Sequence, residues 1–215
     1  WWVIALQIRS TAVCWLVSVG FELCELSLRA WLPNFVECWF DSVVLDLLVC
    51  NGAGIAVGAA TRRWLGIPPY DWLGGAECSH LPLPQQRRRL PWVPVPACGL
   101  RRVLCLLALI CHLLVTMLNG FFLKAALWVD AASRLNVWRL LLWGPLGLLG
   151  VAEYHDFVHG STASAGRRKL GQNAWLAIVI AATEAVVAAR HAQGQPWRLG
   201  ALPAAVRWGW PAAFA

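Results

Sequence analysis

Residues 10–28 read STAVCWLVSVGFELCELSL, and this apolar stretch, with two glutamates set into it, decides the fold. A helix that crosses a bilayer needs about 20 mainly apolar residues. Four further stretches reach or nearly reach that length, so that the set is roughly 10–28, 35–59, 103–123, 137–152 and 174–189. We therefore predict an all-α fold, a polytopic transmembrane helix bundle with about five spans in this chain.

The composition supports a membrane protein and argues against a soluble one. Of the 215 residues, 59% are hydrophobic and 15 are tryptophan, a balance for which a lipid bilayer is the natural solvent. The formal charge of +7 comes mostly from arginine clusters between the apolar stretches, where the positive-inside rule operates. Nucleic acid is therefore a poor partner. No linker divides the chain, so we expect residues 1–215 to form a single integral membrane domain.

Residues 60–102 separate the second and third apolar stretches and are rich in proline and arginine. Prolines at this density disfavour a long helix, so the segment is predicted to be an exposed loop. Its arginines place it on the cytosolic side. They are Arg62, Arg63, Arg87, Arg88, Arg89, Arg101 and Arg102. If the spans alternate, the short connection at Leu32-Pro33-Asn34 lies on the opposite side.

Five acidic residues fall within 25 positions of the first two apolar stretches. They are Glu22, Glu25, Glu37, Asp41 and Asp46. A carboxylate in the hydrocarbon region costs several kcal/mol by insertion scales, so such residues usually face an internal cavity and act there. Only Arg29 stands among them as a countercharge, which is too little for a purely structural ion-pair network.

Helical periodicity arranges these polar residues on two facing surfaces. At 100° per residue, one face of the first helix carries Ser18, Glu22, Glu25 and Arg29. A face of the second carries Glu37, Asp41, Leu48 and Asn51. Asp46 lies about 180° from Glu37 and does not fit. It must serve a third helix or mark a local break in the second one.

The donor types in this cluster indicate a hard cation. Carboxylate and amide oxygens without histidine or cysteine suit Ca²⁺ or Mg²⁺ better than softer transition metals. A cationic substrate group such as an ammonium is the other available countercharge. A phosphate ligand with a cationic head group therefore suits the cluster once a divalent ion bridges phosphate and carboxylates.

Two further features leave alternatives open. The small residues of Asn51-Gly52-Ala53-Gly54 permit either close helix packing or the approach of a ligand to the backbone. Glu184, inside the fifth stretch, either faces the polar pocket or pairs two helices.

The stretches FELCEL (21–26), LPNFVECWFD (32–41), LD (45–46) and CNGAGI (50–55) resemble the phosphatidylserine synthases of the base-exchange type. This family consists of multi-pass enzymes of the endoplasmic reticulum membrane. The resemblance implies that L-serine replaces the choline of phosphatidylcholine or the ethanolamine of phosphatidylethanolamine, with Ca²⁺ and without a nucleotide. A homo-oligomer is compatible with it.

Seven positions match residues that the family regards as functional, namely Glu22, Glu25, Asn34, Glu37, Asp41, Asp46 and Asn51. Ca²⁺ would be held among Glu25, Glu37 and Asp41. Glu22 or Asp46 would orient the serine ammonium, and Asn34 and Asn51 would hydrogen-bond the phosphate or the serine carboxylate.

This sequence departs from the family pattern at Phe40, where tryptophan is usual, and at Ala53, where glycine is common. The family's His-x-x-Gly-Trp motif would end at about Trp1. We therefore expect the chain to be a piece of a larger multi-span enzyme and to be inactive alone if that histidine is the general base.

Three other functions compete with this interpretation. A synthase that uses CDP-activated lipid usually carries the signature D-G-x2-A-R-x8-G-x3-D-x3-D, which is missing here. An ion-coupled transporter would also place acids inside the membrane, but no inverted repeat is visible. A non-catalytic membrane subunit would be indicated by a degraded His-x-x-Gly-Trp motif upstream.

Overall fold

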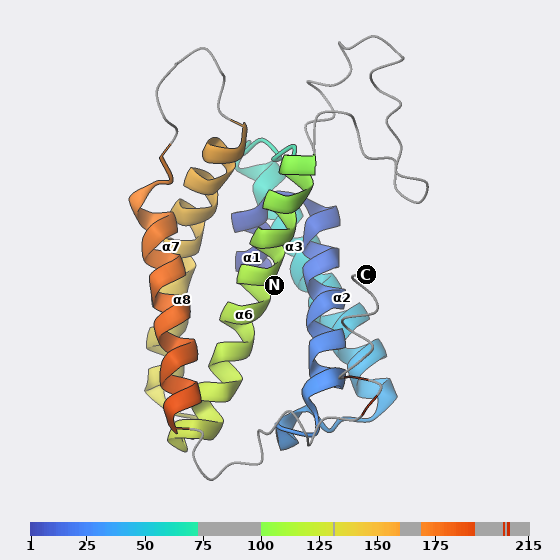
Figure 1. Cartoon of the computed structure of the whole chain (residues 1–215). Coiled ribbons are helices and arrows are strands. Elements are labelled where there is room, and N and C mark those ends of the chain that lie inside the picture. Colours follow the sequence, from blue (N-terminus) through green and yellow to red (C-terminus); the bar gives the residue numbers. More distant parts are fainter. Residues whose placement is uncertain (73–99, 131, 160–168, 192–203, 205, 207–215) are drawn as a thin grey trace.

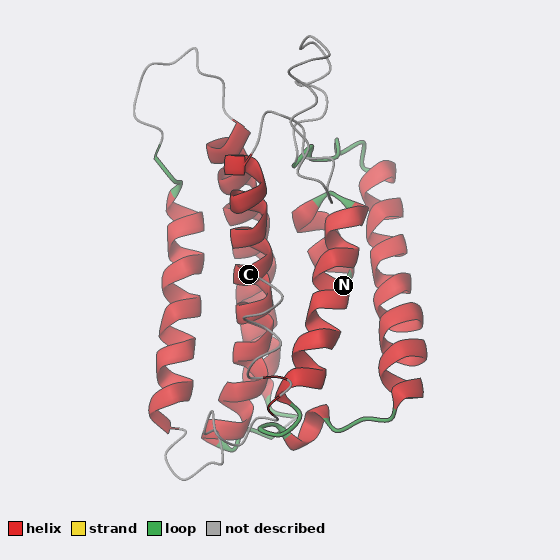
Figure 2. Cartoon of the chain, turned by 45° about the vertical axis from the view of Figure 1, so that its right-hand side comes forward, coloured by secondary structure: helices red, strands yellow, loops and turns green. Residues whose placement is uncertain are grey.

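The computed structural model describes residues 1–72, 100–130, 132–159, 169–191, 204 and 206. Regular structure within these residues is entirely helical (Figure 2). The N-terminal part contains the helices α1 (Trp2–Ile8) and α2 (Thr11–Leu28), the 3-10 turn η1 (Pro33–Phe35), the π-helix η2 (Asp41–Asn51) and α3 (Gly52–Trp64). The C-terminal part contains α6 (Leu100–Leu127), α7 (Arg134–His159) and α8 (Gln172–His191).

Five helical segments are long and apolar enough to cross a membrane, which confirms the predicted fold class. They are α2, the continuous η2–α3 segment Asp41–Trp64, α6, α7 and α8. Figure 1 shows α2 and the η2–α3 segment on one side of the bundle, α7 and α8 on the other, and α6 between them. In agreement with this view, α6 packs against both α2 and α8.

Helix α7 is longer than the sequence predicted. It has 26 residues and extends beyond the expected stretch 137–152 at both ends, and like that stretch it includes Pro145. A proline inside a helix removes one backbone hydrogen bond and loosens the ladder around it. Here the Gln7 side chain lies beside that point, and its Nε2 donates to the carbonyl oxygens of Trp143 at 3.2 Å and Gly144 at 3.1 Å. Helix α1 thereby braces the proline turn of α7.

The loop predicted at 60–102 is shorter at both ends, because α3 continues to Trp64 and α6 begins at Leu100. Its segment 73–99 lies outside the described residues, so the cytosolic placement stays a prediction. The described portion packs onto the bundle. Tyr70 stacks on His155 of α7 with ring centroids 4.0 Å apart, and the Trp72 indole donates to the carbonyl oxygen of Ile8 at 2.9 Å.

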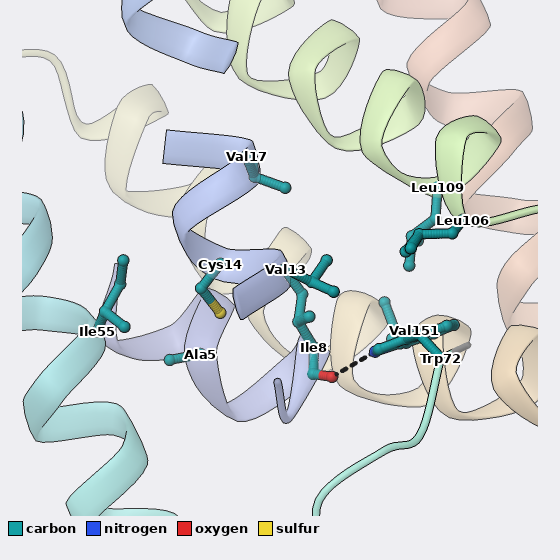
Figure 3. Packing of buried hydrophobic residues seen from close by; sticks show 10 residues of the cluster. All are labelled: Ala5, Ile8, Val13, Cys14, Val17, Ile55, Trp72, Leu106, Leu109 and Val151. Atoms are coloured by element: carbon teal, nitrogen blue, oxygen red, sulfur yellow. Dashed lines mark hydrogen bonds between the residues drawn. The ribbon is translucent and has the colours of Figure 1, made fainter. Parts of the chain in front are cut away.

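The main apolar core lies where α1 meets α2, α3, α6 and α7 (Figure 3). Its buried members are Ala5, Ile8, Val13, Cys14, Val17, Ile55, Trp72, Leu106, Leu109 and Val151. Small residues let α1 and α3 approach closely. A Cβ atom added at Gly58 would lie 2.5 Å from the Ala5 Cβ, and one at Gly54 would lie 2.6 Å from the Trp1 Cβ. Glycine is therefore required at both positions for this packing.

Candidate functional site

The facing polar surfaces of α2 and the second span meet at Asn51. Its amide Nδ2 donates to the Ser18 hydroxyl at 3.0 Å and to Glu22 Oε1 at 3.1 Å. Ser18 is fully buried and Asn51 nearly so. Because both amide hydrogens of Asn51 are directed at α2, the network fixes how the two spans face each other at this level. Of the expected face of the second span, Asn51 is thus found opposite Ser18 and Glu22.

Only one of the two carboxylate oxygens of Glu22 has a hydrogen-bond partner in this network. Its Oε1 accepts the bond from Asn51, whereas Oε2 is buried and has no hydrogen-bond partner among the described residues. A buried acceptor without a partner costs about 1–3 kcal/mol, and more when it is charged. An oxygen held in this state is available to a ligand that brings a proton donor or a positive charge.

A π-helix in the second span explains how Asp46 reaches the acidic cluster. The second span is π-helical from Asp41 to Asn51 and α-helical after that. A π-helix bonds i to i+5 and turns less per residue than an α-helix, so residues five apart, such as Asp46 and Asn51, lie closer to one face. The Asp46 carboxyl lies beside the Glu37 carboxyl, and its charge acts on Glu22. Of the two explanations that the sequence left open, the local break in the second helix is the correct one.

Glu37 does not lie on the second helix, contrary to the expected helical face. It precedes the helix, in the connection after η1, and reaches the cluster through Asp46. Desolvation by the surrounding protein and the negative charges of the adjacent Asp46 and of Asp41 raise the pKa of Glu37 above its usual value. Glu25 on α2 interacts electrostatically with Glu22, Glu37 and Asp46. Glu22, Glu25, Glu37 and Asp46 therefore form one electrostatically coupled group, and Asp41 is linked to it through Glu37.

The remaining predicted residues lie at the edge of this group. Asp41 begins the π-helix and accepts a hydrogen bond from the Cys38 thiol at 3.1 Å. Asn34 is exposed in η1, and no contact among the described residues joins its side chain to the acids. Arg29 is exposed at the end of α2, and within the described part of the chain no ion pair links it to the cluster. The acids therefore lack a countercharge in the described structure.

The described residues contain no group of three His, Cys, Asp or Glu side chains arranged to hold a metal ion. The chemistry of the donors nevertheless fits a hard cation, because the cluster offers carboxylate oxygens, one of them buried without a partner, and the Asn51 amide oxygen. The binding of a cation by Glu25, Glu37 and Asp41 therefore stays a prediction.

Gly52, Gly54 and Glu184 all serve helix packing, which was one of the two alternatives that the sequence left open for each. A Cβ added at Gly52 would lie 3.2 Å from the Trp15 ring, and Gly54 contacts the N-terminal residues, so both face protein atoms. Glu184 forms a two-pronged ion pair with Arg139 of α7, at 2.8 Å to Nε and 2.7 Å to Nη2. It therefore pairs two helices.

Ser18 is the member of the site that was not predicted as functional, although its position was visible in the sequence. It precedes Glu22 by one helical turn on the same face of α2. A serine in an apolar span attracts no attention alone, because its hydroxyl can bond to its own helix. Only the position of Asn51 shows that the hydroxyl accepts a bond from the second span instead.

These observations define the class of the protein: a polytopic helical membrane protein with an uncompensated cluster of acids between its first two spans. The family model described as "Phosphatidyl serine synthase" matches residues 1–192. The chain belongs to this family.

Curated relatives agree with the family match. Phosphatidylserine synthase 2 of Danio rerio is 35% identical over 199 residues, which cover 89% of this chain and 43% of the relative. The Homo sapiens protein of the same name is also 35% identical, over 89% of this chain and 40% of its own length. CDP-diacylglycerol–serine O-phosphatidyltransferase 2 of Oryza sativa subsp. japonica is 33% identical over 90% of this chain and 47% of its own length. The chain thus spans less than half the length of these relatives.

Proposed function

We propose that the acidic cluster is the site at which the complete protein transfers a phosphatidyl group to L-serine by exchange of phospholipid head groups. Family membership supports the reaction class, since the matched relatives are named for making phosphatidylserine or for transfer of a phosphatidyl group to serine. The assignment to this site rests on one observation. Glu22 Oε2 is buried without a hydrogen-bond partner among the described residues, and it lies among acids that interact electrostatically. Such a site favours ligands with ammonium groups, which serine and a zwitterionic phospholipid both carry.

In the proposed reaction the serine hydroxyl oxygen attacks the phosphorus of phosphatidylcholine or phosphatidylethanolamine. One P–O bond forms to serine and one P–O bond breaks to choline or ethanolamine. The proton of the serine hydroxyl ends on the departing alcohol. One phosphodiester replaces another, so the balance requires no nucleotide.

The residues of the cluster divide into positioning and binding groups. Asn51 uses both amide hydrogens on Ser18 and Glu22, so it has none left to donate to a phosphate or a serine carboxylate, and its free carbonyl oxygen is an acceptor. We therefore assign Asn51 to positioning Glu22 rather than to the anion contact that the resemblance implied. Glu22 and Asp46 are the proposed acceptors for the serine ammonium. Asn34, exposed in η1, keeps its amide for the phosphate or the carboxylate of serine.

The proposal includes Ca²⁺, with Glu25, Glu37 and Asp41 as ligands. When bound there, the ion would neutralise the phosphodiester and the charge that builds in the transition state. Desolvation and then the like charges of Asp46 and Asp41 raise the pKa of Glu37, and a cation would relieve the repulsion between these charges.

A second candidate for the donor of the phosphatidyl group is CDP-diacylglycerol. It is favoured by the name of the rice relative, which specifies this lipid. Both donors would deliver the same phosphatidyl group to serine, and they differ in the leaving group. Exchange is preferred because the resemblance of residues 21–55 is to the base-exchange enzymes. We also propose the endoplasmic reticulum as the membrane, on the same resemblance.

The test is incorporation of labelled serine by the full-length protein in proteoliposomes of phosphatidylcholine and phosphatidylethanolamine. We expect phosphatidylserine to form with release of choline or ethanolamine, without nucleotide, and to stop when calcium is chelated. Incorporation that requires CDP-diacylglycerol and releases CMP would overturn the exchange mechanism. No incorporation with either donor would overturn the proposed activity.

A further inference from the structure

The structure contains a cavity on the far side of α6 from the acidic cluster. It has a volume of about 520 Å³ and lies between α1, α6, α7 and α8. Volumes of 300 to 1,000 Å³ are typical of small-molecule sites, so the cavity is large enough for an ordered ligand. Ile4, Leu113, Leu140 and Ile178 place aliphatic side chains from the four helices in its wall.

Helix α6 separates the cavity from the proposed exchange site. Its Leu114 lies against α2, where a Cβ added at Gly20 would be 3.4 Å from the leucine side chain. The neighbouring Leu113 and Met117 line the cavity. None of the acids of the cluster belongs to the lining. A molecule in the cavity is therefore distinct from one that reacts at the cluster.

Three of the polar side chains in the wall, those of Arg139, Gln7 and Tyr154, form hydrogen bonds within the protein, and the His112 ring lies against the Trp143 ring. Arg139 is paired with Glu184 and also donates to the carbonyl oxygen of Thr116 at 2.6 Å. Gln7 is used by the carbonyls of α7, and the Tyr154 hydroxyl donates to the carbonyl oxygen of Cys105 at 2.8 Å. The wall thus offers little to a charged head group, and its chemistry suits an apolar occupant.

We propose that this cavity holds an acyl chain of a membrane lipid other than the one that reacts. The cavity lies among membrane-spanning helices, where lipid chains are the surrounding apolar molecules. Gly144 leaves additional open space in the wall of the cavity. This residue lines the cavity, and a Cβ added there would meet no atom within 4 Å. The inference goes beyond the proposed reaction and does not depend on it.

The open space at Gly144 provides a matched pair of variants. Gly144→Leu adds four carbon atoms at this position in the wall, the first of which meets no atom within 4 Å, whereas Gly144→Ala adds that first carbon alone and leaves most of the space. Ile178→Phe fills the cavity from α8 and serves if Gly144→Leu lowers the yield of folded protein.

The experiment uses the full-length protein in vesicles of phosphatidylcholine that carries a photoreactive diazirine near the end of one acyl chain. After illumination, labelled peptides are mapped by mass spectrometry. Expected adducts lie on the half-buried, cavity-lining residues Leu113 and Met117, are retained in Gly144→Ala and are lost in Gly144→Leu or Ile178→Phe. Labelling of Leu149, which is 55% exposed and outside the lining, should be unchanged in every variant.

Two results would overturn the proposal. One is labelling of Leu149 without any adduct on the cavity residues, as when another segment of the full-length protein fills the space. The other is cavity labelling that Gly144→Leu and Ile178→Phe leave unchanged. The readout is independent of serine incorporation, so failure here is distinct from failure of the proposed activity.

Discussion

Removing the Ser18 hydroxyl and the Asn51 amide, singly and together, measures the network that holds the two acidic spans in register. Asn51 makes one neutral hydrogen bond, to Ser18, and one to a carboxylate, on Glu22. Typical net values are about 0.5–1.5 kcal/mol for the first kind and about 1.5–3 kcal/mol for the second. Asn51→Ala should therefore lower the free energy of unfolding by about 2 to 4.5 kcal/mol, and Ser18→Ala by about 1 kcal/mol.

The double variant distinguishes a direct bond from general loss of packing. Because Ser18 loses its partner as soon as Asn51 is replaced, the two losses should not add, and the coupling energy should be about 1 kcal/mol. The assay is unfolding of the full-length protein in mixed detergent micelles by increasing mole fraction of SDS, followed by circular dichroism. Thr183→Val is the control, since this exposed hydroxyl donates only to the Val179 carbonyl of its own helix. Additive losses, or a Ser18→Ala variant no less stable than the control, would refute the reasoning.

Three further predictions concern charge and packing elsewhere. Glu37→Gln should raise the unfolding temperature at neutral pH with calcium chelated, because a raised pKa means that the ionised carboxyl is disfavoured in the folded protein. That penalty exists above the ordinary glutamate pKa and vanishes below it, so parent and variant should converge near about pH 4, and a gain independent of pH would contradict the assignment. Arg139→Leu should destabilise by about 3–5 kcal/mol, and adding Glu184→Leu should restore much of the loss; a double variant no better than the single one would show that the ion pair is not the cause. Asn119→Ala should reduce thermal stability without a specific effect on exchange, because its Nδ2 donates to the Ala181 carbonyl of α8 at 2.8 Å; lost exchange at unchanged stability would place Asn119 in the site instead.

The number of spans and the polar face of α2 that meets Asn51 could be predicted from the sequence because both follow from local rules. Hydropathy over about 20 residues identifies a span, and the helical period groups Ser18 with Glu22 on one face. An unpaired carboxylate in an apolar helix marks the site without any knowledge of its neighbours.

The details that were missed do not follow from hydropathy and the helical period alone. The π-helix from Asp41 to Asn51 has no composition that separates it from an α-helix, and the only sign of it was the misfit of Asp46. Helix α7 was predicted too short because its ends, at 134–136 and 153–159, carry polar residues that a search for apolar stretches leaves out. Glu184 could be assigned to pairing only once Arg139 was placed beside it.

The central claim is that the cluster around Glu22 transfers the phosphatidyl group to serine, and the most direct measurement is the serine incorporation rate of full-length Glu22→Gln. Glutamine keeps the size of the side chain and can still accept the bond from Asn51, so folding should be preserved. Asp156→Asn, which removes a carboxylate that is 86% exposed, is the matched control and should incorporate serine at the parent rate. We predict that Glu22→Gln loses about a hundredfold or more of the rate, as expected for a charged group in a reacting site. A folded Glu22→Gln protein that incorporates serine as fast as Asp156→Asn would contradict the account.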